Sequence, residues 1–150
     1  MSEFETAVFF GVRAAVAILA GFIVGLERTM NGHEAGIKTL VFVSLGSCVY
    51  SSLGFYLALG NDEIDPTRVI GQIVTGVGFL GAGVIVRTTE KVSGLTTAAI
   101  IWMSCSLGAA AGAGLYAVPL FAAVTYIVIV IVLKKFEKLL QRIDKKKLEE

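Results

Sequence analysis

Hydrophobic residues in this chain gather into five long stretches, and short polar segments separate them. The stretches cover residues 7–26, 37–59, 69–86, 95–111 and 115–133. Each is close to the roughly 20 residues with which a helix crosses a hydrocarbon layer about 30 Å thick. They lack the alternation of barrel strands, and a helix satisfies its own backbone polar groups in lipid. The pattern therefore predicts an all-α, polytopic helical membrane protein with about five transmembrane helices.

The last 17 residues differ from these stretches. Seven of the 13 Lys and Arg residues fall within them, while Phe136, Leu139, Leu140 and Ile143 recur at helical spacing. We therefore divide the chain into a transmembrane domain, 1–133, and a short basic amphipathic C-terminal helix, 134–150. Two interpretations of this tail stay open. It lies on the anionic inner leaflet, or it is a charged stop to the last span.

The distribution of Lys and Arg predicts the orientation. The first six residues carry no basic side chain, and the second loop is acidic. Arg28 and Lys38 lie in the first loop, Arg87 and Lys91 in the third, and the tail is strongly basic. Because basic residues concentrate on the cytoplasmic side, we expect the N-terminus outside and the C-terminus in the cytoplasm. Arg68 is the exception, and we interpret it as an interfacial or paired side chain.

The composition of the chain narrows the kinds of partner, site and activity that we expect. Hydrophobic residues make up 55% of the chain before its 17 glycines are counted, against about 45–50% with glycine included in soluble proteins. The net charge of +1 by itself gives no information about nucleic acid, but the Lys and Arg residues outside the tail are scattered and suggest no basic groove, so we expect no nucleic-acid partner. Cys48 and Cys105 lie in apolar stretches without partners at metal-ligand spacing, so we predict small buried side chains, no metal site and no cofactor. The polar inventory suggests no catalytic triad, and we expect no enzyme.

Arg13 lies about two turns inside the first stretch. An ionisable side chain costs about 2.5–3.5 kcal/mol at a helix centre on insertion scales, so it needs a partner. Three interpretations stay open: Arg13 extends to the outer interface and contacts lipid phosphate, it belongs to an ion or ligand path, or it forms an ion pair with Asp62, Glu63 or Asp65.

The third stretch is unusually rich in glycine, with five glycines inside 13 residues. Glycine lowers helix propensity, so something must require the missing side chains. Close packing or oligomerisation is one interpretation, because small residues let membrane helices approach. A bent or broken helix whose carbonyls line a polar cavity is the other. The candidate packing positions across the chain are Gly21, Gly25, Gly76, Gly78, Gly81, Gly83, Gly108 and Gly112.

Polar residues near the ends of the stretches are candidates for function. Those on the predicted cytoplasmic side either anchor the helices at the interface or form a shared polar cluster. The acidic outer loop and the polar residues after it would face the other side. The full set of polar candidates is Arg13, Glu27, Arg28, Lys38, Thr39, Asp65, Arg68, Gln72, Arg87, Thr96 and Thr97.

Several short motifs follow one another along the chain. They are Gly25-Leu26-Glu27-Arg28, Ala35-Gly36-Ile37-Lys38-Thr39, Asp65-Pro66-Thr67-Arg68 with Gln72-Ile73-Val74, the glycine run 76–85, and Gly94-Leu95-Thr96-Thr97-Ala98-Ala99 with Trp102. In this order and spacing they resemble the MgtC/SapB family of bacterial inner-membrane proteins over about residues 7–133. Lys38 and Ser93 stand where many members carry Arg.

The resemblance implies a five-helix domain in the bacterial cytoplasmic membrane. For some members it also implies a part in growth at low magnesium and in survival inside host cells. We expect a non-enzymatic protein that acts through helix–helix association and regulates another membrane complex, such as the F-type ATP synthase. The expected partners also include membrane lipid and further copies of the chain. The alternative is a transporter or channel for a small cation such as magnesium, formed by an oligomer.

Overall fold

The computed structural model describes residues 2–148, and the side chains of residues 2–141. The predicted all-α architecture is confirmed, because four of its five helices are long and apolar enough to cross a membrane. The third has 17 residues and is the shortest. The helices are α1 (Glu3–Met30), α2 (Ile37–Leu57), α3 (Thr67–Gly83), α4 (Leu95–Gly112) and α5 (Ala117–Leu148).

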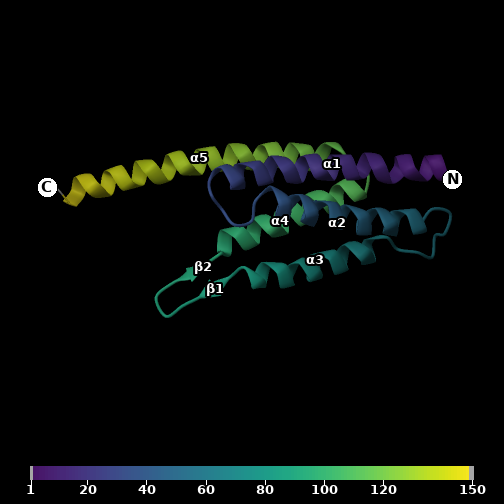
Figure 1. Cartoon of the computed structure of the whole chain (residues 1–150), viewed down its shortest axis with the longest axis horizontal. Coiled ribbons are helices and arrows are strands. Elements are labelled where there is room, and N and C mark those ends of the chain that lie inside the picture. The colour runs from purple at the N-terminus through teal and green to yellow at the C-terminus, as the bar shows by residue number, and fades with distance from the viewer. Residues whose placement is uncertain (1, 149–150) are drawn as a thin grey trace.

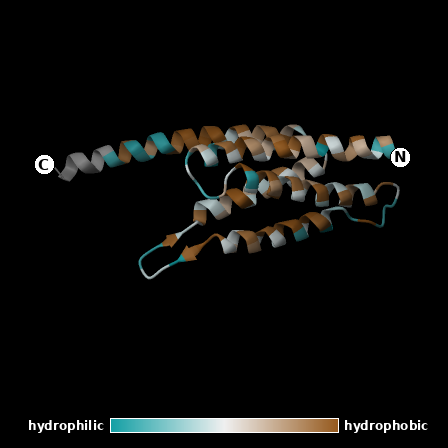
Figure 2. Ribbon diagram, viewed as in Figure 1, coloured by the Kyte–Doolittle hydropathy of each residue, from teal (hydrophilic) through white to brown (hydrophobic). Residues whose placement is uncertain are grey.

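The helices run roughly along one direction (Figure 1). α1 and α5 lie together on one side, α2 and α4 occupy the middle, and α3 lies on the other side. The N-terminus and the α2–α3 loop share one end, whereas the α1–α2 loop and the far end of α5 share the other. Apolar residues dominate the helices, and the hydrophilic segments lie at the two ends (Figure 2). The loops are thus sorted between the ends as the basic residues predicted.

α2 packs closely between α1 and α4, and glycines make this possible. A Cβ at Gly21 would lie 2.8 Å from the carbonyl oxygen of Leu40 on α2. A Cβ at Gly108 would lie 2.6 Å from the carbonyl carbon of Ser44, and one at Gly112 would lie 2.7 Å from a side chain of α2. Only glycine permits these approaches, so α1, α2 and α4 form the core of the fold.

Buried serine hydroxyls connect the same three helices. Four of them donate to a backbone carbonyl of a neighbouring helix, and Ser47 donates to Val43 in its own helix, so each hydroxyl is satisfied away from water. Cys48 and Cys105 are also buried, as predicted for small interior side chains. The shortest of the serine bonds between helices join Ser44 to Ala17 at 2.8 Å, Ser104 to Leu40 at 2.8 Å and Ser51 to Ala109 at 2.9 Å.

α3 is the least buried helix of the core region. Val77 is its one fully buried residue. The helix runs unbroken over its 17 residues, so the glycine run does not interrupt it. It ends at Gly83 and not at residue 86, because β1 (Val86–Arg87) pairs antiparallel with β2 (Val92–Ser93). The third loop is therefore a small hairpin that the hydropathy pattern did not predict.

The basic tail continues α5 through Leu148 without a break. The spacing of apolar and basic residues predicted a basic amphipathic helix over 134–150, and in the structure these residues, as far as Leu148, belong to the same 32-residue helix as the last span. The helix continues past residue 134 because Lys, Glu and Leu, which favour helix, follow the last apolar stretch and no Gly or Pro interrupts the chain there. The side chains beyond residue 141 lie outside the described part of the structure.

Candidate functional site

A polar pocket lies at the end of the bundle that carries the hairpin, between α1, α4 and α5. Its volume is about 630 Å³. Apolar side chains of α4 and α5 form much of the wall, among them Leu95, Ile100, Ile129 and Leu133. Its polar lining brings together predicted candidates from α1 and α4 and further residues, namely Glu27, Arg28, His33, Thr96, Thr97, Tyr126, Lys134 and Glu137.

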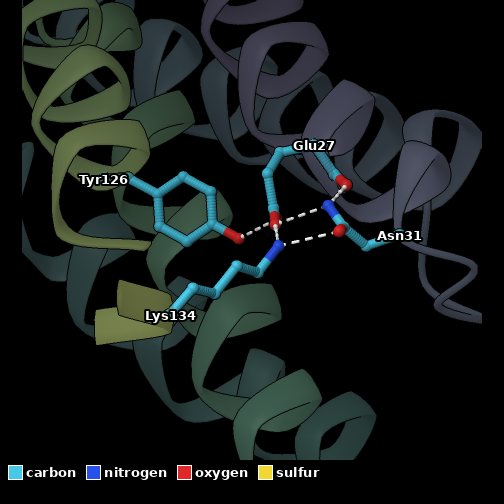
Figure 3. Close-up of polar contacts among 4 residues, drawn as sticks. All are labelled: Glu27, Asn31, Tyr126 and Lys134. Atoms are coloured by element: carbon cyan, nitrogen blue, oxygen red, sulfur yellow. Dashed lines mark hydrogen bonds and ion pairs between the residues drawn. The ribbon is translucent and has the colours of Figure 1, made fainter. Parts of the chain in front are cut away.

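Glu27 near the end of α1 is held by two residues of α5 and by Asn31, which directly follows α1 (Figure 3). The Tyr126 hydroxyl on α5 donates to Glu27 Oε2 at 2.7 Å. Lys134 Nζ lies 3.0 Å from Oε1, and Asn31 Nδ2 donates to the same oxygen at 2.9 Å. Lys134 also donates to Asn31 Oδ1 at 2.8 Å. Both carboxylate oxygens are therefore occupied, and the network fastens α5 to the end of α1.

Arg28 is the adjacent residue, and its charge has no such partner. The residue is 5% exposed. Its Nη2 donates to Thr97 Oγ1 at 3.0 Å, while its Nε is buried without a hydrogen-bond partner. Among the described side chains the one ion pair joins Lys134 to Glu27, so Arg28 forms no ion pair of its own, although the neighbouring Glu27 carboxylate attracts it electrostatically. Partial burial, and then the positive charge of Arg28, lower the pKa of His33 in the neighbouring loop.

The N-terminus of α4 faces the same pocket. Gly94 precedes the helix with φ +86°, and a Cβ there would lie 2.9 Å from the carbonyl carbon of Val84. Glycine is required at this position for both reasons. No side chain caps the helix, and its first backbone bond runs from Ala98 to Gly94. The amide groups of residues 95–97 therefore stand at the pocket without a capping side chain.

Three predicted candidates on this end lie outside the pocket. Lys38 and Thr39 are exposed in the first turn of α2, and Arg87 is exposed on β1. None of the three side chains makes a hydrogen bond within the described residues. The shared polar cluster therefore includes Glu27, Arg28, Thr96 and Thr97, but not these three.

Asp65 and Arg68 lie at the opposite end, before and within the first turn of α3. Asp65 Oδ1 accepts from the Thr67 amide at 2.9 Å and from the Thr67 hydroxyl at 2.6 Å. These bonds lower the pKa of Asp65. Arg68 is exposed, as expected for an interfacial side chain. Asp65 thus serves as a local cap for α3.

Gln72 lies on an apolar groove between α2 and α3. The groove has a volume of about 500 Å³ and is also lined by Phe42, Tyr50 and Leu80. Gln72 is exposed there and makes no hydrogen bond within the described part of the chain. It is the main polar side chain of a surface that is otherwise nearly all apolar.

Arg13 is not paired with the acidic loop. Its guanidinium carbon lies 3.3 Å from the ring centroid of Phe9, one turn earlier on α1, where a cation and an aromatic face attract. Arg13 also approaches the α4–α5 turn, where a Cβ at Gly114 would lie 3.3 Å from Nη2. Its Nε and Nη1 are buried without hydrogen-bond partners. The ion pair with the acidic loop is therefore absent among the described residues.

Sequence reasoning missed three members of the cluster: Asn31, Tyr126 and Lys134. One available signal was Tyr126, a hydroxyl inside an apolar stretch, which requires a partner in lipid. Another was the position of Lys134 directly after that stretch. Neither signal names its partner, because Tyr126 and Glu27 are 99 residues apart in the chain.

Comparison with known proteins identifies the family. The MgtC family profile matches residues 15–139. "Putative magnesium transporter YhiD" of Escherichia coli K12 is 37% identical over 142 residues, which cover 91% of this chain and 65% of that protein. Protein SapB of Bacillus subtilis is 38% identical over 79% of this chain and 53% of its own length. Protein MgtC of Brucella abortus is 41% identical over 67% and 41%, respectively.

The chain thus spans between about two fifths and two thirds of the lengths of these relatives. No solved structure matches it. The matched residues, 15–139, include most of the membrane helices as well as the polar pocket. The chain belongs to the MgtC family of multi-pass membrane proteins.

Proposed function

We propose that this chain is a non-enzymatic protein of bacterial magnesium physiology that binds other transmembrane helices and so regulates another membrane complex. The name of the YhiD relative refers to magnesium transport, which supports the physiological setting. None of the names of the three relatives above describes an enzyme. The mode of action rests on one observation, the open glycine face of α3.

We call Gly71, Thr75, Gly78 and Ala82 the α3 outer face. Their spacing places them on one side of the helix, since each residue advances about 100° around the axis. All four are exposed, and a Cβ at Gly71 or Gly78 would meet nothing within 4 Å. The Thr75 hydroxyl donates to the Gly71 carbonyl at 3.0 Å, which leaves the surface small and its polar group satisfied. Such a surface suits the close approach of a second helix.

The contrast with the core supports this interpretation. Gly21, Gly25, Gly108 and Gly112 are all occupied by backbone or side chains of this chain. The glycines of the α3 outer face also lower the helix propensity of their segment, but no other described part of the chain packs against them. A helix of another copy or of another protein supplies that partner in our proposal. Homo-oligomerisation and binding to a complex such as the F-type ATP synthase are the two associations to test.

The core of the single chain offers little support for an ion path. Small side chains fill the contacts between α1, α2 and α4, and the buried serine hydroxyls are bound to carbonyls. The residues that the structure describes include no group of three or more His, Cys, Asp or Glu side chains able to hold a metal ion. These observations favour association over conduction by one chain.

The proposed setting is the bacterial cytoplasmic membrane, with the N-terminus outside. Arg28, Lys38 and Arg87 lie at the end from which the basic part of α5 projects. That distribution favours this end as the cytoplasmic one.

Gly78→Leu tests the association. Because a Cβ at Gly78 meets nothing within the chain, the variant should fold normally, whereas the bulky side chain should block a close helix partner. Gly11→Leu is the matched control, since Gly11 on α1 is equally open. Gly81→Leu is less selective, because Ala98 Cβ lies 3.7 Å from the added Cβ.

Particle mass in detergent and recovery of co-purifying membrane proteins are the measurements. Gly78→Leu should lose association while its circular dichroism matches that of the wild type, and Gly11→Leu should retain association. An unchanged particle mass and unchanged partners in Gly78→Leu would refute the proposal. Subunits of the F-type ATP synthase should appear among the partners if that complex is the target.

A cation transporter formed by an oligomer is the second candidate. The exposed amide of Gln72 on the α2–α3 groove favours it, because a neighbouring copy could enclose that groove. Magnesium flux into proteoliposomes is the test. Gln72→Leu should then abolish flux, and Asp65→Asn should reduce it while preserving the cap, since Asn is an equally good capping residue. Absence of flux from folded wild-type protein would exclude this candidate.

A further inference from the structure

The polar pocket contains a buried positive charge that forms no ion pair within the described residues. Arg28 is 5% exposed, and its Nε makes no hydrogen bond. Glu27 is the nearest acidic residue in sequence, but Tyr126, Lys134 and Asn31 already occupy its oxygens. A buried charge requires compensation, and in the described residues Arg28 has one hydrogen bond, to the Thr97 hydroxyl, and the electrostatic attraction of Glu27, whose oxygens are bound to other residues.

A second feature of the same pocket also attracts negative charge. α4 is an 18-residue helix whose N-terminus lines the pocket without a capping side chain. The free amide groups of its first turn and the positive end of the helix dipole favour an anion there. Thr96 adds an exposed hydroxyl beside them. Arg28 and the start of α4 are adjacent, because the guanidinium contacts Thr97 in that first turn.

The remaining lining indicates what the anion is attached to. Ile129, Val130 and Leu133 of α5, with Leu95 and Ile100 of α4, form an apolar wall beside the charged groups. Glu137 also lines the pocket, but one turn beyond Leu133 along α5. A volume of about 630 Å³ accommodates an anionic group together with an apolar segment.

We propose that this pocket binds one phosphate oxyanion through Arg28, Thr96 and the amide groups at the start of α4, with an apolar part of the ligand against α5. Guanidinium and helix amide groups are the donors with which proteins hold phosphate oxygens. A phospholipid headgroup and free inorganic phosphate share this chemistry. The apolar wall favours the lipid. The site would exist whether the chain regulates a partner or transports a cation.

Binding can be measured on the full chain purified in a nonionic maltoside detergent without phosphate. Inorganic phosphate is titrated by calorimetry, and short-chain phosphatidylglycerol is added before native mass spectrometry, with a neutral diacylglycerol as the reference. One-to-one binding of either phosphate compound, without binding of the neutral lipid, is expected. Binding of phosphatidylglycerol alone identifies a headgroup site, and binding of inorganic phosphate identifies a site for the free anion.

Two matched pairs of variants localise the site. Arg28→Gln should weaken binding about ten- to a hundredfold, the usual effect of removing a charged hydrogen bond, whereas Arg87→Gln at the exposed hairpin should not. Thr96→Asp places a carboxylate where the anion would bind and should weaken binding at least about tenfold relative to Thr96→Asn. The aspartate also favours the first turn of α4, so this variant should fold even if Arg28→Gln does not.

The proposal is overturned if neither phosphate compound binds one-to-one. It is also overturned if the Thr96→Asp and Thr96→Asn variants bind with equal affinity, or if Arg28→Gln folds and binds as the wild type does. Loss of binding in Arg87→Gln to the same extent would indicate nonspecific attraction to basic residues and would likewise reject a defined site.

Discussion

Gly108 marks a close approach of α4 to α2, so its replacement by alanine tests the packing of the core. A Cβ at this position would lie 2.6 Å from the carbonyl carbon of Ser44 and 2.8 Å from its Cα. Ordinary van der Waals contact begins at 3.4 Å, and the Ser44 carbonyl oxygen lies closer still, so the two backbones would have to separate locally by more than about 0.8 Å. The obstacle is backbone, which cannot turn aside as a flexible side chain can.

The cost follows from the contacts that this separation disturbs. Overpacking a well-packed core costs about 1–3 kcal/mol. Hydrogen bonds from Ser51 to Ala109 and from Ser104 to Leu40 cross the same interface, and each contributes about 0.6 kcal/mol on average in membrane proteins. Alanine returns about 0.5–1 kcal/mol of helix propensity. The free energy of unfolding of Gly108→Ala should therefore fall by about 1–3 kcal/mol.

Unfolding by sodium dodecyl sulfate in dodecyl maltoside micelles measures this change. Trp102, the single tryptophan, lies on α4 and reports the transition together with circular dichroism. Gly46→Ala on α2 is the matched control, because its added Cβ meets nothing within 4 Å. It should be neutral or stabilising. Equal stability of the two variants would show that α2 and α4 are not this close, and would refute the packing argument.

Three further changes test the core, the polar cluster and the α3 cap. Ser44→Ala removes a hydroxyl bound to α1 and should lower the free energy of unfolding by about 0.6 kcal/mol, and by at most about 1.7 kcal/mol, in the same assay. Tyr126→Phe removes a hydrogen bond to Glu27 and should lower the free energy of unfolding by about 1–3 kcal/mol in the same assay. An unchanged free energy of unfolding would contradict the hydrogen-bond network around Glu27. The pKa of Asp65 is lowered by its bonds from Thr67, so the contribution of this cap is present above about pH 4 and is lost as the pH falls through the lowered pKa. Protection of the first α3 amides from hydrogen exchange should accordingly fall only as the pH drops below about 4 in the wild type, and should not fall in Asp65→Asn.

The glycines of the core and those of the α3 outer face show that the same residue type has different roles in this chain. Gly108 and Gly78 both belong to runs of small residues inside apolar stretches. The first is in contact with α2, whereas the second is open. An open glycine face can be filled by a partner without disturbing the fold, which is why Gly78→Leu separates association from folding.

Sequence alone determined the class of the protein. The lengths and apolar content of its stretches predicted the helices, because a hydrocarbon layer requires about 20 apolar residues and internally satisfied backbones. The motifs between residues 25 and 102 indicated the MgtC/SapB family, and the family match over residues 15–139 confirms it. The sequence also indicated Glu27, Arg28, Thr96 and Thr97 as polar candidates, but it did not indicate that these four residues share one pocket.

Tertiary structure decided the partners of these residues. Arg28 and Thr97 are 69 residues apart in the chain, and Glu27 and Tyr126 are 99 apart. Which residues meet depends on the rotation of each helix about its axis and on the order of the helices in the bundle. The hydropathy of α2 and α4 carries almost no information on rotation, because apolar residues surround both helices. Backbone approach at particular glycines and hydrogen bonds between helices set that rotation, and both exist only once the helices have packed.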